Sequence, residues 1–272
     1  MALFSLRLIS REPELTSLEL FELGAQGIEE RAHPAGAELV LYSEQADELQ
    51  RLAEQVEGSR IVRYRVVPEQ DGWETAWAKD LETIALCKGF WVKPTTSRGH
   101  APASGQLIHI EPDLAFGIGS HPTTQLAARA LTAHARGARR VLDVGTGTGV
   151  LALLARLLGA ERVLGLEIDA RALRSAQKNL ALNLNCQPVE FSATPLAEIE
   201  EGGWDVVIAN IEAPVLLDLA ADLMRVSRGA SAVILTGILT DRLSEVLRRY
   251  EQLGARPSEI RDLDDWRLVV LK

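Results

Sequence analysis

Cysteine is scarce in this chain, and no metal-ligand pattern is present. Its 272 residues contain two widely separated cysteines, Cys87 and Cys186, and five histidines without ligand spacing. Neither a disulfide framework nor a metal site is therefore predicted. No apolar run is long enough to span a bilayer, and the first residues lack the pattern of a signal peptide. We expect a cytoplasmic protein with no membrane partner.

Lysine is absent from the first 58 residues, which hold four arginines and twelve acidic residues. This segment carries a net charge of −8, and the whole chain carries −9. Such a charge opposes binding to a phosphate backbone, so no direct nucleic-acid partner is expected. An acidic surface suits a basic protein partner, and a solvated face that only aids solubility is the alternative.

The first 67 residues alternate between strand-like and helix-like patterns. Helical periodicity covers residues 11–24 and 44–58, and the order of elements is βαββαβ. This order is typical of a small ferredoxin-like α+β domain. We predict this domain over residues 1–67, followed by a linker and helix at 68–82. The strand-like segments are residues 3–10, 26–32, 37–43 and 60–67.

A longer α/β pattern begins at residue 139. Apolar segments of strand length alternate with helical segments, and the strands are almost continuously apolar. A sheet covered by helices on both faces requires such strands. The pattern predicts a doubly wound α/β domain over residues 83–272. Its predicted strands are residues 139–145, 162–169, 188–193, 204–211 and 231–238.

The segment "LDVGTGTGV" lies where the first of these strands turns into a helix. Gly145, Gly147 and Gly149 allow a tight turn and a close approach of a ligand to the helix N-terminus. A dinucleotide loop requires a later third glycine, at the position that Val150 occupies, and the Gly-Lys-Ser/Thr of a P-loop NTPase is absent. A tight turn without a ligand is the alternative.

Two further polar residues lie at the carboxyl ends of predicted strands, where doubly wound sheets bind ligands. Glu167 ends the second strand, and a carboxylate there accepts hydrogen bonds from ribose hydroxyls. The nearby Asp169 is better suited to cap the next helix. Asn210 ends the fourth strand and is expected to face the pocket, the alternative being an asparagine that only ends a strand.

Five segments together resemble the ribosomal protein L11 methyltransferase family (PrmA). The resemblance is strong over residues 70–272 and rests on pattern alone before them. Four departures are mild. Ile118 and Ser120 stand where the family commonly has threonine, and Glu167 stands where aspartate is commoner. Ile211-Glu212 follow Asn210 where the family often has isoleucine or leucine and then another residue. The segments are "FGIGSHPTT" (116–124), "VLDVGTGTGVLAL" (141–153), "GLEID" (165–169), "ANIEAP" (209–214) and "LTGIL" (235–239).

The resemblance implies a class I, Rossmann-like methyltransferase domain that uses S-adenosylmethionine. It implies that Thr124 contacts this cofactor, that Phe116 lies beside its reacting end, and that Asn210 is the catalytic residue that orients a substrate amine. His121 is either a general base or a histidine of a structural turn. The implied cofactor-binding residues are Phe116, Thr124, Asp143, Gly145, Gly147, Gly149, Glu167 and Asn210.

The implied substrate is a large-subunit ribosomal protein, methylated on lysine side chains and on its N-terminal amine. The acidic first domain would dock this basic protein, and we expect a monomer. Three alternatives stay open. They are a methyltransferase of the same fold acting on another protein or a small amine, an RNA methyltransferase, which should show a basic docking face, and a non-catalytic cofactor-binding or assembly protein.

Overall fold

The computed structural model describes residues 4–25, 28–43, 45–56, 58, 60–68, 82–97, 99, 102–112, 117–186, 188–200 and 202–272. The chain divides into two compact units, Met1–Ala76 and Trp77–Lys272. The linker and helix predicted at 68–82 fall almost entirely on residues 69–81, outside the described residues.

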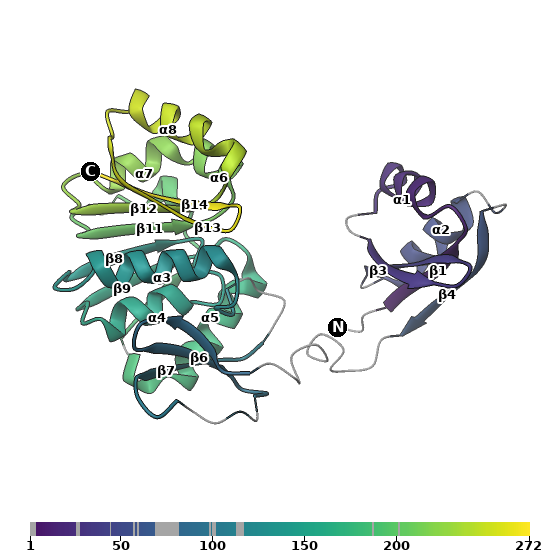
Figure 1. Cartoon of the computed structure of the whole chain (residues 1–272), viewed down its shortest axis with the longest axis horizontal. Coiled ribbons are helices and arrows are strands. Elements are labelled where there is room, and N and C mark those ends of the chain that lie inside the picture. The colour runs from purple at the N-terminus through teal and green to yellow at the C-terminus, as the bar shows by residue number, and fades with distance from the viewer. Residues whose placement is uncertain are drawn as a thin grey trace. The chain divides into compact units, whose positions relative to one another are not determined.

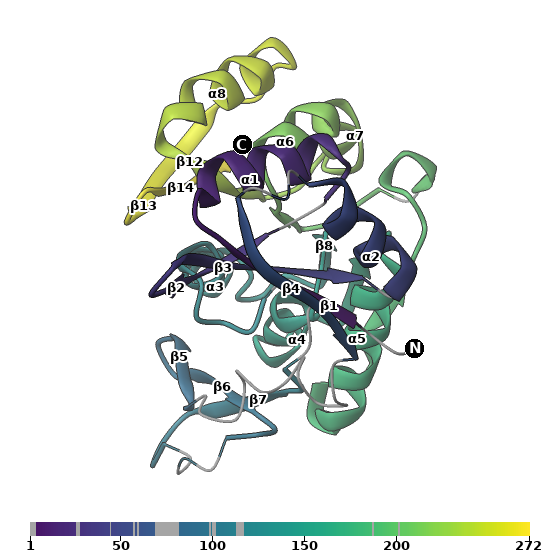
Figure 2. The ribbon, with the colours of Figure 1, turned by 90° about the vertical axis from the view of Figure 1, so that its right-hand side faces the viewer.

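The N-terminal unit is a four-stranded antiparallel sheet in the order β2-β3-β1-β4. Successive side chains of a strand point to opposite faces of the sheet, so Leu6 and Leu8 of β1 share one face. They pack in a core with leucines of β3 and α2. Both helices cover one face of the sheet (Figure 2). This is the predicted ferredoxin-like arrangement. Its elements are β1 (Phe4–Ser10), α1 (Pro13–Glu22), β2 (Glu29–His33), β3 (Gly36–Ser43), α2 (Ala46–Gln55) and β4 (Ile61–Pro68).

The second unit is built on a seven-stranded sheet in the order β10-β9-β8-β11-β12-β14-β13. Strands β8 to β12 are parallel to one another, whereas β14 runs antiparallel to β12 and to β13. The predicted doubly wound α/β fold is confirmed. The strands are β8 (Arg140–Val144), β9 (Arg162–Leu166), β10 (Glu190–Ser192), β11 (Val206–Asn210), β12 (Ala232–Leu239), β13 (Pro257–Leu263) and β14 (Trp266–Leu271).

Helices cover both faces of this sheet, with one hydrophobic core on each side (Figure 1). One side carries α3 (Pro122–His134), α4 (Val150–Leu157) and α5 (Ala170–Leu182). The other carries α6 (Ala213–Asp218), α7 (Ala220–Val226) and α8 (Leu243–Gln252). Helices α6 and α7 are separated by Leu219 alone. Short 3₁₀ turns occur at Leu184–Cys186, Leu196–Glu198 and Thr240–Arg242.

A small sheet of β5 (Ile84–Cys87), β6 (Phe90–Pro94) and β7 (Gln106–Ile110) precedes α3. Two buried asparagines of α5 attach it to the domain. Asn179 accepts from the Glu111 amide at 2.8 Å, and Asn183 both accepts from the His109 amide and donates to its carbonyl. These bonds fix the chain that leads to the segment before α3.

Within the described part of the chain, no helix is both long and apolar enough to cross a bilayer.

Candidate functional site

A cavity of about 730 Å³ lies at the carboxyl ends of the parallel strands. Gly145 after β8, Glu167 after β9 and Asn210 at the end of β11 all line it. Strand β8 lies between β9 and β11, so the chain reverses its direction of winding at this point. Doubly wound sheets bind their ligands at such a switch point. The fold thus brings three of the predicted site residues to one cavity.

The glycine turn after β8 closes onto the end of β9. The Gly145 and Thr146 amides both donate to the Leu166 carbonyl at 2.9 Å. Gly145 has a φ of +72°, and an added Cβ would lie 2.3 Å from the Ile211 side chain. Gly147 also lines the cavity. The turn therefore presents main chain, without side-chain bulk, to a ligand.

Glu167 fixes the geometry on the β9 side of the cavity. Its two carboxylate oxygens accept from the Gly147 amide and the Asp169 amide, each at 3.0 Å. Asp169 also lines the cavity, and its carboxylate accepts from the Arg171 amide at 2.7 Å. The helix cap predicted at Asp169 is therefore confirmed. Each carboxylate oxygen keeps a further lone pair, so Glu167 remains able to accept from ligand hydroxyls.

Asn210 provides an unused acceptor on the β11 side. Its side-chain Oδ1 is buried and has no hydrogen-bond partner among the described residues. An unsatisfied buried acceptor costs about 1–3 kcal/mol unless a ligand or water supplies a donor. Strands β11 and β9 flank β8, which separates Asn210 from Glu167 by roughly 10 Å, or two strand spacings. The cavity therefore has two polar ends.

The described part of the segment 116–124 forms the wall next to the glycine turn. The Thr148 hydroxyl donates to the Gly117 carbonyl at 2.8 Å, which ties this segment to the turn. His121 then begins α3, and its Nδ1 accepts from the Thr123 amide. His121, Thr123 and the more distant Trp266 all line the cavity. The position of Phe116 lies outside the described residues.

The donor set suits a nucleoside ligand without phosphate. Glu167 can accept from vicinal ribose hydroxyls, and the main chain of the turn can hold small charged groups. Among the described residues that line the cavity, none is lysine or arginine. No group of three potential metal ligands occurs in the described part of the chain. These features fit S-adenosylmethionine, and Glu167 is the residue that would hold its ribose hydroxyls.

Comparison with known proteins identifies the family. The family model described as Ribosomal protein L11 methyltransferase (PrmA) matches residues 15–272. The chain belongs to the PrmA family. Relatives named ribosomal protein L11 methyltransferase include one from Halalkalibacterium halodurans, 35% identical over 203 residues, and one from Geotalea daltonii, 37% identical over 215 residues.

These alignments cover 75% of this chain in both cases, but only 65% of the Halalkalibacterium protein and 68% of the Geotalea protein. The chain therefore spans about two thirds of the length of such relatives. The crystal structure of a ribosomal protein L11 methylase from Lactobacillus delbrueckii subsp. bulgaricus superposes with a TM-score of 0.63 at 29% identity. It covers 71% of this chain and 98% of that chain. The PrmA fold is thus shared over most of the molecule.

Three predicted contact residues of the PrmA site lie behind the cavity wall. Asp143 is buried, and its carboxylate accepts from the Thr146 hydroxyl at 2.6 Å, beneath the turn. Burial raises the pKa of Asp143 to about 7. Gly149 begins α4, and an added Cβ would lie 2.7 Å from the Phe191 ring. Both residues support the turn, and the direct ligand contacts predicted for them stay predictions.

The third of these residues is Thr124, which is fully buried and not among the described residues that line the cavity. Its neighbour Thr123 lines the cavity instead. The Oγ1 of Thr124 is buried and has no hydrogen-bond partner among the described residues. The cofactor contact predicted for Thr124 stays a prediction.

His121 has the geometry of a helix cap. Its Nδ1 accepts from the Thr123 amide at 3.3 Å and lies 2.8 Å from the Thr123 hydroxyl. Burial lowers the pKa of His121, which favours the neutral ring. The neutral ring then carries its hydrogen on Nε2, and its lone pair at Nδ1 is already used. Of the two interpretations of His121, the structure favours the turn histidine over the general base.

Trp266 and Glu212 are among the lining residues that were not predicted from the sequence. Trp266 lies on β14, where no strand was assigned, and its ring packs edge-on against His121 at 5.0 Å between centroids. Glu212 begins α6, two residues after Asn210, and its side chain is exposed. Acidic residues are common at helix starts, so sequence alone gives this position no special meaning.

Gly237→Ala is expected to destabilise the protein next to the site. Gly237 has a φ of +87°, and an added Cβ would lie 2.2 Å from the Ile211 carbonyl oxygen. We expect a loss of about 2 kcal/mol beyond that of Gly229→Ala, measured by urea unfolding. Gly229 is the matched control because it also has a positive φ but faces open space. An equal decrease in the free energy of unfolding of the two variants would show that the close approach to Ile211 does not affect stability.

Proposed function

We propose that this chain transfers methyl groups from S-adenosylmethionine to amine nitrogens of ribosomal protein L11. The observation that carries the proposal is the buried, unpartnered Oδ1 of Asn210 in a cavity whose other end presents Glu167. Membership of the PrmA family and the names of the relatives support it. We expect a monomer that acts in the cytoplasm.

The cofactor, when bound, supplies an activated methyl group on a sulfonium sulfur. Glu167 would accept from its ribose hydroxyls, and the main chain at Gly145 and Gly147 would hold its amino-acid end. Thr123 would add a hydroxyl to the same wall. Together these residues fix the ligand against rotation, which is a positioning role.

Asn210 would hold the substrate amine. Its Oδ1 accepts one amine N–H, and this aims the nitrogen lone pair along the cavity. The amine must be neutral to attack, whereas free lysine titrates near about 10.4 and an α-amine near about 8. Removal from water lowers the pKa of an amine. The proton then leaves to water, since His121 has no free lone pair in the observed geometry.

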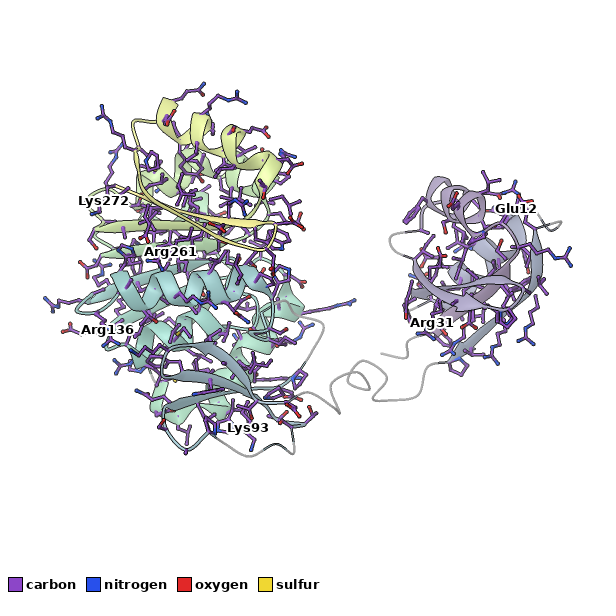
Figure 3. The ribbon with its side chains drawn as sticks, in the orientation of Figure 1. Glu12, Arg31, Lys93, Arg136, Arg261 and Lys272 are labelled. Atoms are coloured by element: carbon purple, nitrogen blue, oxygen red, sulfur yellow. The ribbon has the colours of Figure 1, made fainter. Side chains whose placement is uncertain are left out.

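The N-terminal unit is proposed to dock the substrate protein. Its helices α1 and α2 carry acidic residues, and in Figure 3 Glu12 projects beside these helices. The opposite face of the sheet is mixed in charge: Arg7 pairs with Arg65 across β1 and β4, and Arg31 pairs with Glu38 across β2 and β3. A basic protein therefore suits the helical face. The acidic residues of this face include Glu14, Glu19, Asp47, Glu48 and Glu54.

RNA is the alternative substrate class. RNA docking requires a basic face, and the arginines of this sheet face lie among glutamates, as the pairing of Arg31 with Glu38 shows. Transfer of labelled methyl from S-adenosylmethionine separates the candidates when L11 and ribosomal RNA are offered together. We expect label in L11. Label in RNA alone would overturn the proposed substrate, and no label in either would overturn the proposed activity.

Glu167→Ala is expected to weaken S-adenosylmethionine binding by about 1.5–3 kcal/mol, the size of lost charge-assisted hydrogen bonds. The variant also releases the Gly147 and Asp169 amides that hold the turn. Titration calorimetry measures the change. Asp169→Ala is the control, because its carboxylate is engaged by its own helix. If Asp169→Ala is the damaging variant and Glu167→Ala is silent, the ribose assignment is wrong.

A further inference from the structure

Three carboxylates line the cavity, and one of them differs from the other two. Glu167 and Asp169 accept from backbone amides at 2.7–3.0 Å. Glu212 also lines the cavity, but it makes no cap bond at α6 and has no recorded ion pair with any residue that the structure describes. It is exposed to solvent. Its carboxylate therefore keeps its full capacity to bind a cation.

The position of Glu212 places this carboxylate at the Asn210 end. The two residues are separated by Ile211 alone, and all three line the cavity. Val215, one turn into α6, and Trp266 also line the cavity, and Val215 is 43% exposed. None of the described lining residues is lysine or arginine, so no internal cation competes for Glu212.

We propose that Glu212 selects the charged form of the substrate amine by binding its ammonium group at the cavity entrance. The inference rests on the proposed function and names a specificity residue for it. Asn210 alone accepts a hydrogen bond from an amine or a hydroxyl equally well, because a neutral amide oxygen does not distinguish the two. An exposed carboxylate adds that distinction, since it attracts an ammonium ion and not a neutral donor.

The same charge argues against Glu212 as the final proton acceptor. A nearby anion favours the protonated amine, and a carboxylate is a much weaker base than an amine. Glu212 therefore acts when the ammonium enters. The proton leaves to water at the exposed entrance as the amine moves on to Asn210. Removing the negative charge of Glu212 should weaken binding of the substrate ammonium at the entrance. It should also make the bound ammonium lose its proton more easily.

Binding of a minimal probe tests this inference without any turnover. The probe is Nα-acetyl-lysine amide, with S-adenosylhomocysteine present, and its neutral counterpart is Nα-acetyl-norleucine amide. We expect Glu212→Gln to weaken lysine-probe binding about three- to fivefold at low salt, as for a partly exposed ion pair. The difference should shrink as the ionic strength rises to about 0.5 M. Binding of the norleucine probe should not change.

Asp218→Asn is the matched control, because Asp218 is an exposed acid of the same helix that does not line the cavity. It should bind the lysine probe as the wild type does, and Glu212→Asp should retain the salt dependence. Equal loss in Asp218→Asn and Glu212→Gln, or no loss in Glu212→Gln, would overturn the inference. So would a wild type that binds both probes equally.

Turnover provides a second readout with L11 as substrate. Glu212→Gln should raise KM several-fold and shift the rise of kcat to lower pH, because the amine loses its proton more easily. A merely structural role would lower kcat without this pH shift. Should the wild type fail to methylate L11, the proposed function fails. The probe experiment would then still decide whether Glu212 binds an ammonium.

Discussion

A variant without residues 1–68 is expected to bind S-adenosylmethionine normally and to lose methylation of L11. The N-terminal unit has its own core, made of residues between 4 and 66, and the cavity is lined by residues 121–266 alone among those described. Removing the unit therefore takes away a docking surface and leaves the cavity intact. We expect kcat/KM for L11 to fall at least about 10²-fold, since every 1.4 kcal/mol of docking energy is tenfold.

The control for this deletion is a substrate too small to dock. Methylation of Nα-acetyl-lysine amide, slow in both forms, should proceed at the same rate with and without residues 1–68. Calorimetry should give the same Kd for S-adenosylmethionine. A truncated protein that methylates L11 with the kcat/KM of the full chain would contradict the docking role, whereas loss of cofactor binding would show that the second unit depends on the first.

Asn210→Ala is expected to lower kcat on the order of 10²-fold, because one orienting contact to the amine is lost from the transition state. Cofactor affinity should change much less, since Glu167 and the glycine turn lie on the other side of β8. The melting temperature should not fall. The Oδ1 of Asn210 has no partner among the described residues, so its removal breaks no recorded bond to that atom and relieves an unsatisfied acceptor.

The competing interpretation is that Asn210 only ends strand β11. It predicts near-normal kcat and a lower melting temperature. Asn185→Ala is the matched control, because Asn185 is an exposed asparagine of the same domain that does not line the cavity. Both variants should melt like the wild type, and only Asn210→Ala should lose turnover. Normal kcat in Asn210→Ala would leave the residue structural.

The sequence predicted the order of elements well where apolar periodicity was long. Strands β8 to β12 all occur where the pattern placed them. It did not predict β13 and β14. Apolar and polar residues alternate only weakly along these two strands. The turn between them contains Asp264 with a φ of +53°, a backbone conformation that aspartate tolerates better than most residues. Because β14 was missed, Trp266 was missed as a wall of the site.

Site prediction from the sequence was limited by side-chain direction. The spacing of "HPTT" locates the start of a helix, but a one-residue difference at that boundary turns the side chain by about 100°. Thr124 was predicted from the family resemblance, and the structure shows that its neighbour Thr123 lines the cavity. Asp143 was also predicted from the resemblance, and the structure shows that its carboxylate lies beneath the turn.

The most direct test of the proposed activity is the intact mass of L11 after incubation with the full chain and S-adenosylmethionine. Peptide mapping then locates the added groups. We predict increments of whole methyl groups, confined to lysine side chains and the N-terminal amine, and abolished when S-adenosylmethionine is omitted. An L11 mass that stays unchanged, or methyl groups found on oxygen or sulfur atoms, would contradict the proposal.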